Sequence, residues 1–461
     1  MMNTTANTSP ATGAPADAAK RQRLATIQAS LKGRHRSESR FRWFGIASIA
    51  FALAFVVILF GSIMSRGLPA FWQSAITLDV HFDPAIIDVG PMPVREQGEV
   101  PAVYQERLNS WKEELSFVNW NALLAASVQR VAPDAEVSER DLRRLVTSAE
   151  RFRLRDMALA DPSLIGKTVK LTMLADANVD VWLRGNIDRS LPDEQQQLSP
   201  ELRKLADDLK ARGIIGLEFS TTLFTEPDSR SSAASAGLAG AFMGSLYMML
   251  IVIFVSVPIG VAGAIYLEEF APKSRITDLI EVNINNLAAV PSIVFGLLGA
   301  AIFINWLHLP LSAPLVGGLV LSLMTLPTVI ISTRSALAAV PPSIRQAALG
   351  VGASRVQTVF HHVLPLAMPG ILTGAIIGVA QALGETAPLL LIGMSAFVAS
   401  IPATPLEQSS ALPVQIYLWQ ANELRNFFEG RTAAAIMVLL GLMVSLNAFA
   451  VWLRKKLEIR W

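Results

Sequence analysis

The chain has 461 residues, of which 52% are hydrophobic and only 16% are charged. This balance is typical of a protein that crosses a membrane several times, and it excludes a wholly soluble chain. The net charge of +2 gives no indication of a nucleic-acid partner. The absence of cysteine excludes disulfides and thiolate chemistry, and the five histidines lack the spacing of a zinc site, so we expect no bound metal.

Residues 1–42 predict a basic N-terminal arm, disordered as far as about Lys20, where Ala, Thr, Pro and Asn dominate. The basic side chains of this arm are Lys20, Arg21, Arg23, Lys32, Arg34, Arg36, Arg40 and Arg42. The uncharged run that follows predicts a first transmembrane helix over 43–65, because a span needs about 20 apolar residues. The positive flank indicates a cytoplasmic N-terminus.

Residues 66–236 are polar and predict an α+β domain on the outer side of the membrane. Ser138 and Ser199 each stand at the expected N-cap of a helix. The helix after Ser199 places Leu202, Leu205 and Leu209 on one face and ends at Gly213. The predicted strands are Lys167–Leu174, Val179–Leu183 and Ile214–Leu223.

The triplet Gly166-Lys167-Thr168 resembles the end of a nucleotide-binding P-loop. Position 161 is Asp, however, where that motif requires Gly. We therefore expect no cofactor on this chain and no catalysis by it, and any ATP hydrolysis must come from a partner subunit.

Residues 237–453 contain five further apolar runs, so the predicted fold is an all-α polytopic membrane protein of six transmembrane helices. These runs are Gly237–Tyr266, Ile284–Leu307, Ala313–Thr333, Gly370–Gly393 and Ala433–Trp452. An even number of spans returns the tail 454–461 to the side of the N-terminus, and its basic residues agree with a cytoplasmic position. We expect a multi-pass membrane protein in contact with lipid.

Three features within these runs are candidates for function. Gly370, Gly374 and Gly378 recur every four residues, which favours close helix packing, with a face lining a path between two subunits as the alternative. Glu385 is a carboxylate in or near a span, either held structurally near the outer interface or part of a polar gate. Arg334, at the inner end of its run, either extends its charge to the interface or contributes to that gate.

The segment from Gln346 to Pro365, QAALGVGASRVQTVFHHVLP, lies between two apolar runs on the positively charged side. Its spacing resembles the "EAA" loop of ABC-importer permeases, through which these membrane subunits dock onto a separate ATPase. The residues that fit the spacing or stand within it are Gln346, Ala347, Ala348, Gly352, Ala353, Leu364 and Pro365. Two positions depart, since Gln346 stands where the family has Glu and His362 stands where it has an aliphatic residue.

The small residues of this loop suit a docking contact for physical reasons. Ala347 and Ala348 favour a helix that can approach a partner closely. Gly352 suits a turn between two short helices because it tolerates positive φ. Pro365 is expected to stop the second helix before the next span. An ordinary cytoplasmic helical hairpin is the alternative.

Three segments narrow the resemblance to the phosphate permeases of the PstA type. They are Tyr266–Gly299, the GETAPLL run Gly384–Leu390, and Leu412–Trp419. The resemblance covers the chain from about Gly237 onward, and residues 66–236 look like the insert of an extended form of this subunit.

The resemblance implies a type I importer core in which 341–365 is the coupling loop. It also implies a second permease of the PstC type, a dimeric ATPase of the PstB type that uses ATP and magnesium, and a periplasmic phosphate-binding protein of the PstS type. In this family an Arg often stands four residues before the Glu of GETAP, and here that position is Gln381. Arg334 or a residue of the partner permease could substitute for it.

Two other functions fit the same residues. One is a permease for another oxyanion, such as molybdate or sulfate. The other is a membrane receptor whose periplasmic domain senses a ligand.

Overall fold

The computed structural model describes residues 14–457, apart from positions 134 and 136. By its internal contacts the chain forms two compact units, Met1–Ile63 and Met64–Trp461. Helix α1 runs over Ala14–Gly67, so it begins inside the stretch where disorder was expected as far as Lys20. Residues 1–13 lie outside the described part, as do the last four residues of the basic tail, 458–461.

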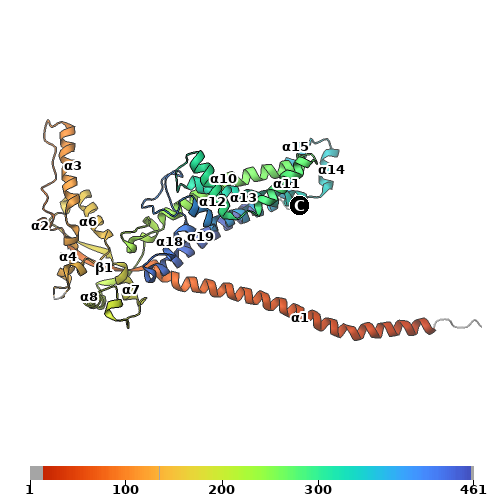
Figure 1. Cartoon of the computed structure of the whole chain (residues 1–461), viewed down its shortest axis with the longest axis horizontal. Coiled ribbons are helices and arrows are strands. Elements are labelled where there is room, and N and C mark those ends of the chain that lie inside the picture. The colour runs from red at the N-terminus through yellow and green to blue at the C-terminus, as the bar shows by residue number, and fades with distance from the viewer. Residues whose placement is uncertain (1–13, 134, 136, 458–461) are drawn as a thin grey trace, which may run out of the picture. The chain divides into compact units, whose positions relative to one another are not determined.

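A three-stranded antiparallel sheet organises the polar region that precedes residue 236. Its strands are β1 Trp72–His81, β2 Thr168–Leu174 and β3 Ile215–Phe219, in the order β2-β1-β3. Ile76, Leu78 and Val80 alternate along β1 and are fully buried, because every second side chain of a strand points to the same face. This face and the helices that cover it form one core (Figure 1).

Most of this region is helical. Its helices are α2 Pro84–Ile87, α3 Pro101–Phe117, α4 Trp120–Val131, α5 Glu139–Leu142, α6 Ala149–Ala160, α7 Ala177–Arg184, α8 Pro200–Ala211 and α9 Thr222–Thr225. Helix α8 has the predicted form: the Ser199 hydroxyl accepts from the backbone N–H of Leu202 at 3.3 Å, and Gly213 has φ of +73°. The Ser138 cap also forms, but it opens only the single turn of α5.

Two of the predicted strands are wrong in whole or in part. Val179–Leu183 lies inside helix α7, where Asp176 caps the first turn and Gly185, at φ +73°, ends the helix. Ile214–Leu223 is a strand only as far as Phe219. The central strand β1 was not predicted at all. Short apolar runs fit a buried helix and a strand equally well until their neighbours are known.

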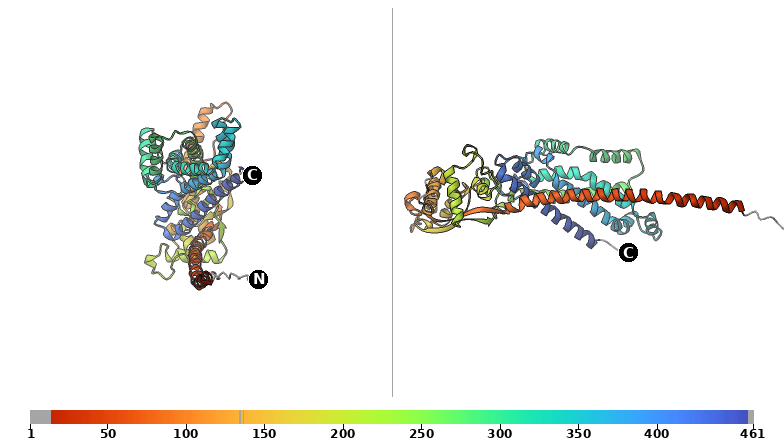
Figure 2. Two further views of the ribbon diagram at one scale, coloured as in Figure 1. Left: turned by 90° about the vertical axis from the view of Figure 1, so that its right-hand side faces the viewer. Right: turned by 90° about the horizontal axis from the view of Figure 1, so that it is seen from below.

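The region after residue 236 is built from long apolar helices. They are α10 Ala239–Ile265, α13 Pro314–Ala338, α16 Leu364–Gly384 and α19 Arg425–Leu457, with the shorter α11 Arg275–Ala288, α12 Ser292–Gly299, α17 Ala387–Leu391 and α18 Leu412–Gln420. Helix α13 packs against both α10 and α16, and Figures 1 and 2 show these helices lying together.

Among the described residues, five helices are long and apolar enough to cross a membrane. A sixth is reached if the pair 275–288 and 292–306, bent by 102°, counts as one span. The predicted run Ile284–Leu307 is therefore not one straight helix. Pro291 stands at the break. Proline interrupts a helix there because it lacks a backbone donor and keeps the preceding residue out of the helical region. The predicted run Gly370–Gly393 is not one helix either, because helix α16 ends at Gly384.

Candidate functional site

The segment that resembles a coupling loop folds as a helical hairpin. Helix α14 covers Pro342–Gly350 and helix α15 covers Arg355–Thr358. Between them Gly352 has φ of +94°, and a Cβ there would meet no heavy atom within 4 Å. The turn therefore requires glycine for its backbone conformation and not for lack of space.

A reciprocal cap fixes the start of the second arm. The N–H of Gln357 donates to the Ser354 hydroxyl at 3.2 Å, and the N–H of Ser354 donates to the Gln357 side-chain oxygen at 2.9 Å. Such a capping box satisfies two donors that a helix N-terminus otherwise leaves open. The turn is thus defined by its own local sequence.

The predicted coupling residues occupy different environments. Gln346 and Ala347 are exposed, Ala348 is buried at 6% exposure, and Ala353 is half-buried. Leu364 and Pro365 are half-buried at the start of α16.

Pro365 does not stop the second helix, contrary to prediction. α15 continues through a π-helical turn, Val359–Val363, directly into α16. The wider π turn just before Pro365 accommodates the proline ring within this continuous helix.

The hairpin carries a set of exposed apolar side chains. They are Leu349, Val351, Val356 and Phe360, with exposures from 46% to 86%.

Ion pairs anchor the base of the hairpin, and sequence reasoning missed them. Helix α10 ends in a π turn, Tyr266–Phe270, that carries Glu268 and Glu269. The Arg345 guanidinium contacts Glu269 at 2.6 Å and donates to the carbonyls of Leu337 and Val340 at the end of α13. The two acidic residues had been noted only as part of the segment that resembles the phosphate permeases.

A second pair lies beside the first. Arg334, near the end of α13, contacts Glu268 at 3.3 Å and Glu281 of α11 at 2.9 Å. We call the five residues Glu268, Glu269, Glu281, Arg334 and Arg345 the ionic brace. It joins α10, α11 and α13 to the hairpin helix α14.

The glycine stripe of α16 lies against α13. A Cβ at Gly370 would stand 2.7 Å from the Ala336 Cβ, and one at Gly374 would stand 2.0 Å from the Ser332 hydroxyl. Gly378 is less tight, with its nearest contact at 3.6 Å. The backbones of the two helices approach closely where these residues are small.

Glu385 and Arg334 do not meet within this chain. Glu385 caps the end of α16, where its backbone N–H donates to the Ala382 carbonyl at 3.3 Å. It is half-buried, and its carboxylate has no hydrogen bond or ion pair with any residue that the structure describes. Arg334 lies level with the Gly370–Gly374 part of α16, about 20 Å along the helix from Glu385 at about 1.5 Å per residue. Gln381 is exposed, one turn before Glu385.

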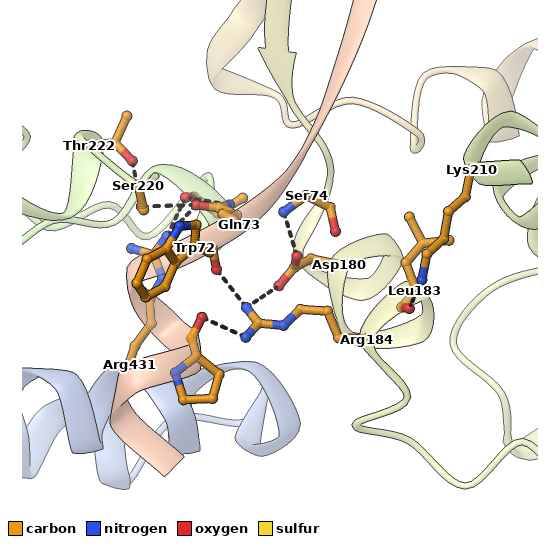
Figure 3. Close-up of polar contacts among 12 residues, drawn as sticks. Trp72, Gln73, Ser74, Asp180, Leu183, Arg184, Lys210, Ser220, Thr222 and Arg431 are labelled. Carbon is orange, nitrogen blue, oxygen red and sulfur yellow. Dashed lines mark hydrogen bonds and ion pairs between the residues drawn. The ribbon is translucent and has the colours of Figure 1, made fainter. Parts of the chain in front are cut away.

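A buried polar network ties the domain around β1 to helix α19 (Figure 3). The Arg431 guanidinium is buried and donates to the Gln73 side-chain oxygen at 2.7 Å and to the carbonyls of Ala234 and Ala236. Arg184 of α7 donates to the carbonyls of Trp72 at 2.7 Å and Pro69 at 2.6 Å. These bonds hold the domain to the ends of the long helices.

Family comparisons fit this architecture. Residues 232–459 match the binding-protein-dependent transport system inner membrane component family. Residues 28–193 match a domain of unknown function, DUF3333. No group of three or more His, Cys, Asp or Glu residues within the described part of the chain could hold a metal ion.

Several relatives are similar over the same half. The phosphate transport system permease protein PstA of Yersinia pestis is 30% identical over 53% of this chain and 81% of its own length. PstA of Mycobacterium leprae is 34% identical over 48% of this chain and 71% of its own length. The probable ABC transporter permease protein YqgI of Bacillus subtilis is 34% identical over 39% of this chain, and the match spans 59% of that relative.

Solved structures add a distant likeness. A chain of the MetNI methionine ABC transporter aligns with a TM-score of 0.38 at 15% identity, over 47% of this chain and 94% of its own length. The assignment rests on the sequence matches instead.

The long apolar helices and the sequence matches define a membrane permease subunit of an ABC importer. The chain belongs to the binding-protein-dependent transport permease family and, within it, is a PstA-like permease. It is a multi-pass protein of the inner membrane. Permease subunits of this family generally have no catalytic activity of their own. The family implies an ATPase and a substrate-binding protein as partners.

Proposed function

We propose that this chain is the permease of an ATP-driven importer of inorganic phosphate. The supporting observation is its identity of 30–34% to permeases named PstA, over 71–81% of their length. A second permease of the PstC type completes the translocation path, and a periplasmic binding protein of the PstS type delivers the anion. This chain binds no cofactor, and the ATPase subunits use the ATP and magnesium.

The bent pair of helices counts as one span in this proposal, which gives six spans and two cytoplasmic termini. Arg454, Lys455 and Lys456 in the last turn of α19 support a cytoplasmic end. Residues 66–236 then form a periplasmic domain between the first and second spans.

The hairpin is the coupling element. Gln346 and Ala347 are exposed, and the apolar side chains near them offer surface that an ATPase groove would bury. The ionic brace then carries hairpin movement into α10, α11 and α13, because a rigid contact at the base leaves the hairpin little independent motion.

Glu385 is the candidate gate residue. Since it has no cationic partner among the described residues, we infer that its partner is a residue of the second permease. An ion pair across the path would both stabilise the carboxylate and close the route until the spans move apart.

Uptake of radiolabelled phosphate by cells that lack this chain tests the function. We expect wild type to restore uptake and Gly352→Arg to abolish it, with an ATPase-subunit deletion abolishing it as well. Gly98→Arg is a matched control, because Gly98 also has a positive φ, of +90°, and open space around it.

Each outcome has a distinct meaning. Restoration by both arginine variants would keep the permease and remove the hairpin from coupling. No restoration by an inserted wild-type chain would contradict phosphate as the cargo, and competition by molybdate or sulfate would then identify another oxyanion.

A further inference from the structure

Four aromatic rings form one continuous cluster where the polar domain joins the long helices. Phe71 stacks on Phe224 with centroids 5.7 Å apart, and Phe224 stacks on Phe219 at 6.0 Å. Trp72 contacts the same Phe219 edge-on at 5.9 Å. The rings come from the 3₁₀ turn Leu68–Phe71, from the first residue of β1, from β3 and from α9, so the fold gathers them from distant parts of the sequence.

Much of this apolar surface is open. Trp72 is 45% exposed, Phe219 is 52% exposed and Phe224 is 43% exposed, although the rings pack on one another. Leu68 and Leu217 extend the surface at 41% and 62%. We call Leu68, Phe71, Trp72, Leu217, Phe219 and Phe224 the aromatic collar. A contiguous apolar surface of this kind is unfavourable in water and marks an interaction site.

Backbone hydrogen bonds fix the collar at the ends of the membrane helices. The N–H of Ser220 donates to the Phe71 carbonyl at 2.7 Å. The N–H of Leu238, just before α10, donates to the Leu223 carbonyl at 2.8 Å, and that of Ala239 donates to Glu226 at 3.1 Å. The collar is thus attached both to the residues that follow the first apolar helix and to the first residue of α10.

The Trp72 indole differs from the buried ones. The ring N–H groups of Trp111, Trp120, Trp182 and Trp419 each donate to a protein oxygen. The Trp72 ring N–H has no such acceptor among the described residues. A half-exposed indole with a free donor is typical of tryptophan at a membrane–water interface, where lipid carbonyls and water accept the bond.

We propose that the aromatic collar lies in the headgroup region of the bilayer and holds the polar domain against the membrane surface. Lipid is the occupant because the collar is continuous with the helices that cross the membrane. The interfacial layer is only about 5–8 Å deep on each side, and the collar's backbone is bonded directly to the helix ends. The proposal rests on the membrane-permease function of those helices.

The test uses depth-dependent fluorescence quenching, which the cysteine-free sequence makes simple. Phe219→Cys and Leu217→Cys each introduce a single thiol for an environment-sensitive fluorophore, and the second variant guards against misfolding of the first. The labelled chain is reconstituted, alone and in the complete transporter, into vesicles that carry nitroxide at the headgroup or deep in the acyl chain. Phe117→Cys, 82% exposed on α3, is the aqueous control, and Val444→Cys, 65% exposed on α19, is the membrane control.

We expect headgroup nitroxide to quench the two collar labels several-fold more than the Phe117 label, while the deep nitroxide quenches Val444 most. Equal quenching at Phe219, Leu217 and Phe117, with Val444 quenched, would overturn this inference alone. Collar quenching that disappears in the complete transporter would also overturn it, since the collar would then contact another subunit. An unquenched Val444 would contradict the membrane function itself and the inference with it.

Discussion

Arg431 shows how much one side chain can carry in this protein. Its guanidinium is only 3% exposed and has no carboxylate within 4 Å in the described chain, so neutral oxygens satisfy it. A buried charge is tolerated only when its donors are used. The donors of Arg431 bond both to Gln73 of β1 and to the carbonyls of the segment before α10. Arg431 therefore links the polar domain to the membrane helix α19.

Arg431→Leu should destabilise the chain by about 2–4 kcal/mol, because it leaves the Ala236 carbonyl buried without a donor and leaves the Ala234 carbonyl with only the Gln73 amide. Thermal unfolding of the purified chain in detergent measures this, and proteolysis at 228–236 reports the loosened joint. Arg425→Leu, on the exposed side of the same helix, should change neither. Equal effects of the two variants would contradict the role of Arg431.

At the scale of elements, the helix pair α13–α16 depends on small residues and the polar domain depends on capped helices. Gly374 has the tightest contact of the stripe, with Ser332 of α13. Helix α7 depends instead on Asp176, whose side chain accepts from the N–H of Asn178 at 2.9 Å. Both positions allow a substitution whose effect follows from local geometry.

Gly374→Leu should separate α13 from α16 and lower the free energy of unfolding by about 1–3 kcal/mol. The Cβ and hydroxyl oxygen of Ser332 occupy the space that the new side chain needs. Uptake should fall with stability, as measured by transport and by thermal unfolding on the same preparation. Gly441→Leu in α19 is the control, since nothing lies within 4 Å of a Cβ there. A stable, active Gly374→Leu chain would show that the close approach is dispensable.

Asp176→Asn should raise stability at neutral pH. Burial raises the pKa of Asp176 above its ordinary value, although hydrogen bonds from Asn178 oppose this. A carboxyl group whose pKa is raised in the native state stabilises the fold at pH values below its unfolded pKa of about 3.9. That stabilisation is lost as the pH rises through the native pKa. Asparagine keeps the cap without the charge, so its advantage should shrink as the pH falls. Unfolding temperatures across that range check the sign, and an advantage that grows in acid would contradict it.

At the scale of the whole molecule, the ionic brace connects the hairpin to helices α10, α11 and α13. Its partners lie 66 and 76 residues apart in sequence for Arg334–Glu268 and Arg345–Glu269. Exposed ion pairs contribute little to the free energy of unfolding. The Glu269 side chain, however, is only 9% exposed, and Arg345 uses several donors at once. These contacts support the proposal that the brace transmits displacement of the hairpin to the helices.

Charge reversal at the brace should uncouple transport. We expect Arg345→Glu or Glu269→Arg alone to lower phosphate uptake by about tenfold or more, which corresponds to about 1.4 kcal/mol. The double reversal should recover part of it, because the pair is restored in the opposite sense. Swapping the exposed pair Arg143–Glu139 in the polar domain is the matched control. Uptake and ATPase rate in the complete transporter measure the effect, and two additive single losses would contradict a specific pair.

The sequence by itself determined the features that depend on near neighbours. Apolar length located the five long helices, Ser199 and Gly213 bounded α8, and the small residues around Gly352 marked the hairpin. Such signals are local, since caps, turns and span lengths involve residues within a few positions of one another.

Only the tertiary structure decided what depends on distant residues. The run 179–183 became a helix, and β1 took its central place between strands far along the chain. Glu385 lies away from Arg334, and Gln73 meets Arg431 across 358 residues. Short apolar runs and single charges have no fixed partner in sequence, so packing and desolvation select their partners only when the chain has folded.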